Sequence, residues 1–437
     1  MEMAVIGTGH VGLATGICFA QLGHRVVCID RDDEKINELS AGRLTIYEEG
    51  LADLLLQQTA EQRLFFTTSM TAVAAADVVI LAVGTAQLPH GESDLKDLEA
   101  AVRSFAIYLS GHTYVMTKST VPIGTNERIN KWIAETTTES FDVVSVPAFM
   151  REGSAASDTM RPERIVIGAS NPNAAEVIAG LHRPLTEQVV QTDWRTAEMI
   201  KHACNAFLAT RISFMNEMAN LCDGVGADIV TVAHAMGLDR RIGSPYLRAG
   251  IGYGGACFPN KDANGLLQIA GNVGHGFKLL KAVIEVNKSQ REHIRGLLTE
   301  ELGELAGRRI ALWGASFKPH TDDVRCSPSL DIAGDLLNEG AFLHLTDPAG
   351  ELNFRKHLEH PALSWFSDPL AAAQGTEAVC LITEWPQFAS VDLQELARCM
   401  KRPVLIDGRN VFQSSQLAGT GIHYVGIGRP NMRGVHS

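Results

Sequence analysis

Short hydrophobic runs of strand length alternate with helical patterns along most of the chain. The first run, Met3–Ile6, is followed by a glycine-rich turn, a helical pattern and a second apolar strand, Arg25–Ile29. Further runs at Asp77–Val83 and Thr113–Met116 both lead into small polar residues. Strands that alternate with helical segments are typical of a wound parallel sheet. The first part of the chain is therefore predicted to be a doubly wound α/β domain.

The turn after the first strand reads GTGHVG over residues 7–12, and an acid, Asp30, follows 18 residues beyond its last glycine. Gly7 permits the tight turn, Gly9 lets the backbone approach a pyrophosphate, and Gly12 lets the helix pack on the strand. The helix N-terminus attracts phosphates. Asp30 accepts hydrogen bonds from a ribose diol and repels a 2′-phosphate, so the pattern predicts NAD in preference to NADP.

Two later strands end in polar residues, Gly84-Thr85 and Ser119-Thr120. Ligands of open parallel sheets bind beyond the carboxyl ends of the strands, so these residues are expected to line the cofactor cleft. They could equally cap the helices that follow.

The strand and helix alternation restarts in the last third of the chain. Strand patterns occur at Arg308–Gly314, Phe342–Leu345, Ala378–Ile382 and Val404–Ile406, without a second glycine fingerprint. This region is predicted to be a Rossmann-like domain that binds a different nucleotide.

A single long helix is predicted between the two wound regions, from Asp193 to Val225. A helix of about 33 residues spans about 50 Å, which is longer than one domain needs. We therefore expect it to join two domains and to contribute to a subunit interface. The resulting division is an NAD-binding domain over residues 1–192, a central helical segment over residues 193–300 and a C-terminal domain over residues 301–437.

Two features of the central segment carry candidate chemistry. Lys201 and Asn205 lie one helical turn apart, so that an amine and a carboxamide can hold an oxyanion, although both could be ordinary surface residues. Cys257 ends the glycine-rich loop that begins at Gly250 and lies near Lys261, a setting that lowers a thiol pKa. The other seven cysteines are expected to be buried thiols in helix or strand patterns.

Composition narrows the class of protein. The 437 residues are 45% hydrophobic and 20% charged, which excludes a disordered or fibrous chain. The net charge of −12 argues against nucleic acid and anionic membranes as partners. The longest aliphatic run, Val78–Val83, is too short to cross a bilayer, and neither zinc-type cysteine spacing nor a secretory signal is visible. No metal site and a reducing, cytoplasmic location are therefore expected.

These residues resemble the UDP-glucose/GDP-mannose dehydrogenase family over nearly the whole chain, and its UDP-glucose branch most. The resemblance implies a four-electron oxidation of the C6 alcohol of a nucleotide sugar to a carboxylate, with two NAD. The motifs that carry it, besides the glycine fingerprint and the cysteine loop, are Ile46–Leu51, Gly84-Thr85, Lys118–Pro122, Arg151–Ser154, Lys201–Leu208, Phe317–Pro319, Thr321–Arg325, Thr383–Trp385 and Asp407–Asn410.

The resemblance also implies the roles of individual residues. Cys257 adds to the C6 aldehyde, Lys201 and Asn205 stabilise the resulting oxyanion, and the thioester formed by the second oxidation is hydrolysed by water. Thr120 and Asp262 position that water, and a carboxylate such as Glu152 activates it. Arg241 reaches the substrate of a neighbouring subunit in the family, which implies a homodimer or a higher homo-oligomer.

The resemblance implies two further sets of contacts. The residues expected to bind NAD are Gly7, Gly9, Val11, Gly12, Asp30, Lys35, Val83, Gly84, Thr85, Ser119, Thr120, Glu152, Lys261 and Arg325. The residues expected to bind the UDP-sugar are Phe149, Met150, Arg151, Glu152, Lys201, Asn205, Arg241, Tyr246, Leu247, Tyr253, Gly254, Cys257, Phe317, Lys318 and Arg409.

Two departures from the family pattern leave alternatives open. Ala148 replaces a glutamate associated with thioester hydrolysis, so Glu152 or Asp262 is expected to substitute. Three residues instead of two separate Cys257 from the Lys261-Asp262 pair, which would rotate the pair by about 100° in a continuous helix. The alternatives to UDP-glucose are GDP-mannose and a UDP-N-acetylhexosamine, and a catalytically weakened nucleotide-sugar-binding subunit is the alternative to an enzyme.

Overall fold

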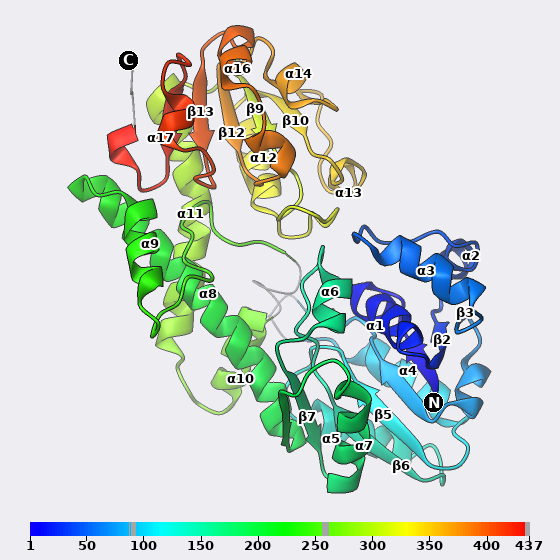
Figure 1. Cartoon of the computed structure of the whole chain (residues 1–437). Coiled ribbons are helices and arrows are strands. Elements are labelled where there is room, and N and C mark those ends of the chain that lie inside the picture. Colours follow the sequence, from blue (N-terminus) through cyan, green and yellow to red (C-terminus); the bar gives the residue numbers. More distant parts are fainter. Residues whose placement is uncertain (87, 89–92, 256–261, 433–437) are drawn as a thin grey trace. The chain divides into compact units, whose positions relative to one another are not determined.

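The computed structural model describes residues 1–86, 88, 93–255 and 262–432, and it divides into two compact units, residues 1–204 and 205–437 (Figure 1). The boundary falls inside one helix, α8 (Trp194–Val225). This confirms the long helix that the sequence predicts. The division into three parts at residues 192 and 300 stays a prediction.

The first unit is built on an eight-stranded sheet with the strand order β3-β2-β1-β4-β5-β6-β7-β8, parallel except where β6 meets β7. Its strands are β1 (Glu2–Ile6), β2 (Arg25–Ile29), β3 (Leu64–Thr67), β4 (Val78–Leu81), β5 (Thr113–Thr117), β6 (Phe141–Ser145), β7 (Ile165–Ala169) and β8 (Val189–Thr192). Its helices are α1 (His10–Gln21), α2 (Asp33–Ser40), α3 (Leu51–Ala60), the 3-10 helix η1 (Met70–Ala75), α4 (Lys96–Ala106), α5 (Thr125–Ala134), α6 (Ala155–Met160) and α7 (Pro172–His182).

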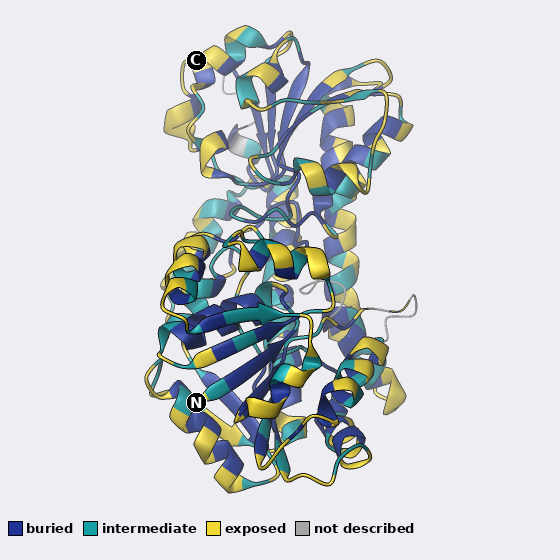
Figure 2. Cartoon of the chain, turned by 90° about the vertical axis from the view of Figure 1, so that its right-hand side faces the viewer, coloured by how far each residue is buried: buried dark blue, intermediate teal, exposed yellow. Residues whose placement is uncertain are grey.

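Both faces of this sheet are buried, as the continuous apolar runs predict. Successive side chains of a strand point to opposite faces, so Met3 and Val5 join the core under α1, α3, α6 and α7. Ala4 and Ile6 join a second core under α4 and α5. The inner strands are accordingly mostly dark blue in Figure 2, whereas the edge strands β3 and β8 and the surrounding helices and loops carry intermediate and exposed residues.

The second unit contains a six-stranded parallel sheet with the order β11-β10-β9-β12-β13-β14. Its strands are β9 (Arg309–Trp313), β10 (Phe342–Thr346), β11 (Leu363–Trp365), β12 (Ala378–Leu381), β13 (Val404–Asp407) and β14 (His423–Gly426). Its helices after α8 are α9 (Ile229–Leu238), α10 (Gly265–Asn272), α11 (Lys278–Leu302), α12 (Pro328–Asn338), α13 (Glu351–Arg355), α14 (Pro369–Ala373), α15 (Pro386–Ala389), α16 (Leu393–Cys399), α17 (Ser414–Leu417) and the 3-10 helix η3 (Pro430–Met432).

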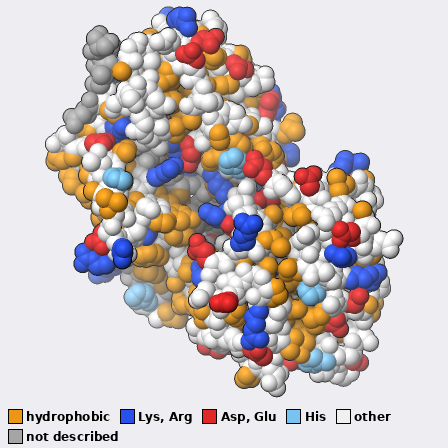
Figure 3. All heavy atoms as spheres, in the orientation of Figure 1, with side chains coloured by type: hydrophobic (Ala, Val, Ile, Leu, Met, Phe, Trp, Pro, Cys, Tyr) orange, Lys and Arg blue, Asp and Glu red, His pale blue; other side chains and the backbone are white. Residues whose placement is uncertain are grey.

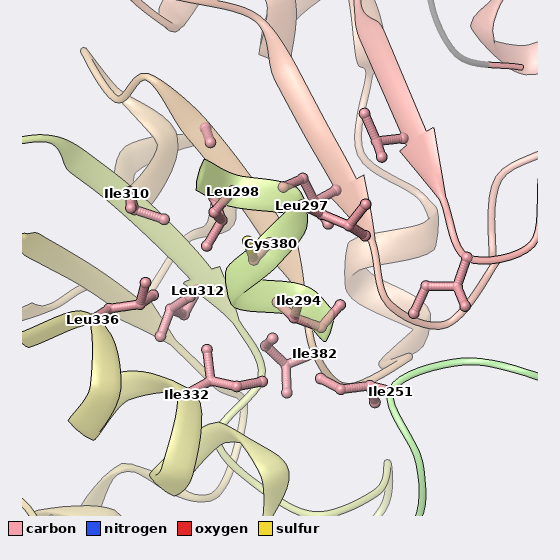
Figure 4. Packing of buried hydrophobic residues seen from close by; sticks show 14 of the residues in the cluster. Ile251, Ile294, Leu297, Leu298, Ile310, Leu312, Ile332, Leu336, Cys380 and Ile382 are labelled. Carbon is pink, nitrogen blue, oxygen red and sulfur yellow. The ribbon is translucent and has the colours of Figure 1, made fainter. Parts of the chain in front are cut away.

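The same alternation builds two cores around this second sheet. Ile310 and Leu312 of β9 face α11 and α12, where Leu298 and Leu336 pack (Figure 4). The intervening Ala311 and the neighbouring Trp313 face the core under α14 to α17. Two doubly wound Rossmann-like domains and a long helix are therefore confirmed.

The cysteines follow the prediction in part. All seven described cysteines are free thiols, and burial raises the pKa of Cys18 to about 12. Cys326 corrects the expectation that each of them lies in a helix or strand. It occupies a turn before α12, with a φ of 55°, and like Cys204 and Cys399 it is only partly buried, which also corrects the expected burial.

The charge on the surface and the hydropathy of the helices are relevant to possible partners. Basic and acidic side chains are scattered among apolar ones on the face drawn in Figure 3. Within the described residues, no helix is both long enough and apolar enough to cross a membrane.

Asp347, directly after β10, organises the carboxyl end of the second sheet. Its carboxylate accepts six hydrogen bonds of 2.6–3.1 Å, from Ala315 N, Ser316 N and Oγ, Ala349 N, Gly350 N and Trp385 Nε1. A carboxylate offers about four lone-pair sites, so this group is saturated by the protein itself. It ties the turn after β9 to the turn after β10.

We expect Asp347→Ala to lower the free energy of unfolding by about 2–4 kcal/mol, because several partly buried donors lose a charged acceptor together. Asp392→Ala is the matched control, since Asp392 is an exposed aspartate that accepts from two N–H groups at the start of α16. Its loss costs about 1 kcal/mol, as for an ordinary helix cap. Chemical denaturation followed by circular dichroism compares the two, and equal losses would contradict the role given to Asp347.

Candidate active site

The glycine turn between β1 and α1 has the geometry that its sequence predicts. Gly7 has a φ of +98°, and a Cβ on Gly12 would lie 1.8 Å from the carbonyl oxygen of Gly7. A Cβ on Gly9 would meet nothing within 4 Å. Gly9 is also the N-cap of α1 and makes no side-chain capping bond. The turn therefore presents open space in front of a helix N-terminus, which suits a phosphate group.

Asp30 stands beside this turn as an ionised acceptor. Its Oδ2 accepts hydrogen bonds from Thr8 N at 2.8 Å and from Thr8 Oγ1 at 2.7 Å. Burial acts to raise the pKa of Asp30, but the bonds from Thr8 and the charge of Lys35 outweigh it and hold that pKa below its usual value. Oδ1 accepts one long bond, from Asp32 N at 3.3 Å, and retains capacity for a ribose hydroxyl. The turn and Asp30 together fit NAD.

The polar residues after β4 and β5 lie together, as the prediction requires. Thr85 Oγ1 donates to the carbonyl oxygen of Thr120 at 3.1 Å, and Ser119 Oγ donates to that of Val83 at 2.7 Å. Helix α5 is capped by Gly124, so Ser119 and Thr120 do not cap it. Val83, Gly84 and Thr85 are thus brought beside the loop that carries Thr120.

A cationic cluster surrounds Phe149 in the loop between β6 and α6. The guanidinium carbon of Arg164 lies 4.0 Å from the centre of the Phe149 ring, and Lys201 Nζ lies 5.3 Å from it. Stacking of this kind orients both cations. The predicted substrate residues Phe149 and Lys201 are therefore neighbours in the first unit.

The rest of this loop is held by acidic side chains. The buried Glu48 accepts from Gly153 N at 2.8 Å and from Ala155 N at 2.6 Å, which fixes the segment containing the half-buried Glu152. Arg151 is paired with Asp158 at 2.7 Å. Met150 packs against the core under α1. Glu48 belongs to a motif that the sequence shares with the family, yet sequence reasoning assigned it no role.

Asn205 and Asp262 meet in the second unit. Asn205 Nδ2 donates to Asp262 Oδ2 at 2.5 Å, and Asp262 is only 1% exposed. Its Oδ1 is also buried and has no hydrogen-bond partner among the described residues. The additional residue before Asp262 therefore does not carry its side chain away from α8. Cys257 and Lys261 lie outside the described residues.

The glycine loop before Cys257 lies against the carboxyl end of the second sheet. Tyr253 N donates to Asn287 Oδ1 at 2.8 Å. A Cβ on Gly254 would lie 2.7 Å from the carbonyl oxygen of Cys326, and one on Gly255 would lie 2.9 Å from the ring of Phe317. Close approach thus explains these glycines and places Tyr253, Gly254 and Phe317 together.

Arg409 joins the same loop to the second sheet. Its guanidinium donates to the carbonyl oxygens of Ile382 at 2.7 Å, Gly252 at 2.9 Å and Phe317 at 3.5 Å. Glu384 lies 3.2 Å away and balances its charge. Arg409 therefore orders the predicted substrate site through backbone contacts.

The other residues of the second unit that are predicted to bind NAD or the UDP-sugar are spread over several segments. Lys318 Nζ lies 5.5 Å from the centre of the Phe317 ring, and Arg325 forms a pair with Asp323 at 2.8 Å. Arg241 pairs with Asp239, and its side chain is 89% exposed. Nearby, Tyr246 is exposed and Leu247 is buried.

Three family models match successive parts of the chain. Residues 1–186 match the NAD binding domain of the UDP-glucose/GDP-mannose dehydrogenase family, residues 195–289 its central domain, and residues 311–414 its UDP binding domain. The first match contains the glycine turn and Asp30, which establishes NAD as the cofactor. The third contains Lys318 and Arg409.

Curated relatives and solved structures agree with these matches. The chain is 45% identical to the UDP-glucose 6-dehydrogenase TuaD of Bacillus subtilis, over 99% of this chain and 94% of that protein. It is 43% identical to the UDP-glucose 6-dehydrogenase of Rhizobium meliloti, over 99% and 100%. A UDP-glucose dehydrogenase structure from Pyrobaculum islandicum superposes with a TM-score of 0.90 at 38% identity, covering 95% of each chain. The chain belongs to the UDP-glucose/GDP-mannose dehydrogenase family.

Proposed function

We propose that this protein oxidises UDP-glucose at C6 to UDP-glucuronate and consumes two NAD for each sugar. The observation that carries the proposal is the 45% identity, over 99% of the chain, to a UDP-glucose 6-dehydrogenase. The glycine turn, the ionised Asp30 and the contact of Asn205 with Asp262 support it, because each supplies a group that this reaction needs.

When bound, NAD accepts one hydride from C6 in each of the two oxidations. The chain positions it through Asp30 and the N-terminus of α1. After the first oxidation, the Cys257 thiolate bonds to the aldehyde carbon, and the carbonyl oxygen becomes an oxyanion that Lys201 and Asn205 stabilise. Loss of the second hydride leaves a thioester. Water then bonds to the same carbon, the carbon–sulfur bond breaks, and the carboxylate and the thiol are released.

We assign activation of that water to Asp262, with Glu152 as the alternative. Ala148 places a methyl group where the family carries a carboxylate, so another acceptor has to take the proton. Asp262 supports this assignment because Asn205 fixes one of its oxygens, while the other has no partner within the described part of the chain. Thr120, held by Thr85, helps to place the water.

The favoured substrate has one serious competitor. A UDP-D-ManNAc dehydrogenase structure from Pyrococcus horikoshii superposes with a TM-score of 0.88 at 27% identity, covering 99% of this chain and 100% of that one. The same chemistry on a UDP-N-acetylhexosamine is therefore the second candidate. GDP-mannose ranks below it, since a GDP-mannose dehydrogenase structure superposes with a TM-score of only 0.55, at 26% identity.

We also propose that the protein works as a homodimer or a higher homo-oligomer in the cytoplasm. Phe207, Phe214 and Leu221 recur every seven residues on α8 and are 63%, 50% and 55% exposed. Such a stripe faces one side of a helix and is suited to a second copy of the chain. The exposed Arg241 is then available to a neighbouring subunit, and the free thiols among the described cysteines suit a reducing compartment.

NADH formation with a panel of nucleotide sugars tests the proposed activity. We expect two NADH for each UDP-glucose consumed, and a much lower kcat/KM with UDP-N-acetylhexosamines and GDP-mannose. Absorbance at the NADH band gives the stoichiometry. A preference for another sugar would replace UDP-glucose, and binding without NADH formation would make the chain a binding subunit.

Asp262→Asn is expected to slow steady-state turnover by about 100-fold or more, because removal of a general base forfeits that much catalysis. Thioester hydrolysis is the step affected, so mass spectrometry should detect the sugar attached to Cys257. Cys257→Ser is the control that abolishes the adduct. Accumulation in Glu152→Gln, and not in Asp262→Asn, would transfer the role to Glu152.

Asp30→Ala is expected to raise the KM for NAD by about 10- to 100-fold, since charged hydrogen bonds to the ribose diol are lost. The preference for NAD over NADP should also weaken, because the negative charge that repels a 2′-phosphate is gone. Thr8→Val is the matched variant, which removes one donor to Asp30 and keeps the carboxylate. An equal effect of both variants would show that Asp30 serves the turn and not the cofactor.

A further inference from the structure

A buried carboxylate on α8 caps a different helix of the first unit. Glu198 is 2% exposed and accepts hydrogen bonds from Gly124 N at 2.5 Å, Asn126 N at 2.9 Å and Asn126 Nδ2 at 2.7 Å. These donors lie at the N-terminus of α5, whose own cap residue is a glycine with a φ of 91° and no side chain. A carboxylate that is distant in the sequence therefore satisfies the helix end and complements its dipole.

A second buried residue, one turn later on α8, forms a hydrogen bond with the loop that precedes α5. His202 is 4% exposed, and its Nε2 lies 2.8 Å from the carbonyl oxygen of Val121. A carbonyl oxygen only accepts, so Nε2 carries the hydrogen and donates it. Glu198 and His202 are four residues apart and thus lie on one face of the helix. Together they hold residues 121–126 at both ends.

The opposite side of this loop is fixed to the cofactor-binding strands. Ser119 Oγ donates to Val83 O, and Thr120 O accepts from Thr85 Oγ1. Thr120 therefore lies in a segment that is anchored to β4 on one side and to α8 on the other. Gly124, the N-cap residue of α5, makes no side-chain capping bond itself, so the carboxylate of Glu198 takes that place.

The face of α8 that carries Glu198 and His202 also carries the proposed catalytic lysine. Lys201 lies between Glu198 and His202 in the sequence, and at 100° per residue the three side chains fall within an arc of about 100°. Any displacement of the loop from α8 therefore changes the distance between Lys201 and Thr120, two groups that the proposed reaction needs in one geometry.

We propose that Glu198 and His202 are positioning residues that set the Thr120 loop against Lys201, without touching the substrate themselves. This inference rests on the proposed function, because it assigns both Thr120 and Lys201 to the same reaction. All three donors that face Glu198 need an acceptor, and the two carboxyl oxygens of Glu198 supply it. An amide at this position would direct an N–H group at one of these donors.

Glu198→Gln tests the proposal. We expect kcat for NADH formation from UDP-glucose to fall by about 10- to 100-fold, as for a small misplacement of a reacting group, while the KM values for NAD and UDP-glucose change less than threefold. In the protein without ligands, deuterium uptake of peptides that contain residues 119–130 should become faster. Unchanged exchange, or a loss expressed only in the KM values, would overturn the proposal.

Glu127→Gln is the matched control. Glu127 also joins α5 to α8, through contacts with Arg195 at 2.6 and 2.8 Å, but this pair is exposed and contributes little. We expect its kcat and its exchange rate to stay at the wild-type values. A loss as large as that of Glu198→Gln would mean that any contact between the two helices matters, which contradicts a specific role for Glu198.

A second pair of variants applies if Glu198→Gln fails to fold. His202→Leu removes the donor to Val121, whereas His202→Gln retains an N–H group near the same place. We expect kcat to fall in His202→Leu and to be at least tenfold higher in His202→Gln than in His202→Leu. Equal kcat values in the two variants would overturn the proposal. If the wild-type protein forms no NADH, the proposed function fails, and the exchange measurement still decides whether Glu198 holds the loop.

Discussion

The burial of both faces of the two sheets is the constraint on which the rest of the structure depends. A strand such as β1 sends Met3 and Val5 into one core and Ala4 and Ile6 into another, so none of these four side chains is available to a ligand. Groups that meet a ligand have to stand where the strands end. This explains why the candidate residues lie in the turns after β1, β2, β4, β5 and β6, and why those turns are held by so many hydrogen bonds.

The two sheets follow the same construction, and their differences show how one binds a dinucleotide. Gly7 N donates to Ile29 O at 2.8 Å, and Gly314 N donates to Thr346 O at 2.9 Å, each with a positive φ. In the first sheet, α1 begins at His10, directly after the turn. In the second, α12 begins only at Pro328, so no helix N-terminus follows the turn.

The acids that follow β2 and β10 also differ, in how many hydrogen bonds each accepts from the protein. Asp30 receives three hydrogen bonds, one of them long, whereas Asp347 receives six and has no lone pair left for a ribose. The second domain thus lacks the glycine fingerprint, and its acid, Asp347, is taken up by hydrogen bonds within the protein. We expect a UDP group at that domain to be recognised by other residues, and Lys318 is the candidate that the sequence predicts.

The sequence was sufficient where a local pattern decides the structure. Apolar runs predicted β2 and α8 to within one residue, and the spacing of the glycines predicted the turn at residues 7–12. It was insufficient where a contact joins distant segments. Nothing local marks Glu198 as the cap of α5, because the capping donors lie more than 70 residues earlier. Glu48 lies inside the motif Ile46–Leu51, yet only the fold shows which N–H groups it binds.

The two departures from the family pattern differ in their physical consequence. The extra residue before Asp262 would rotate the side chain by about 100° only within a helix. Asp262 itself lies in a π-helical turn, residues 262–264, that runs into α10 at Gly265, and its carboxylate nevertheless reaches Asn205. Ala148 is different, since no adjustment of the backbone restores a proton acceptor to a methyl group. In the proposed reaction the loss at 148 requires another acceptor, and the Asp262 carboxylate, which keeps one buried oxygen unpaired within the described chain, is chemically suited to supply it.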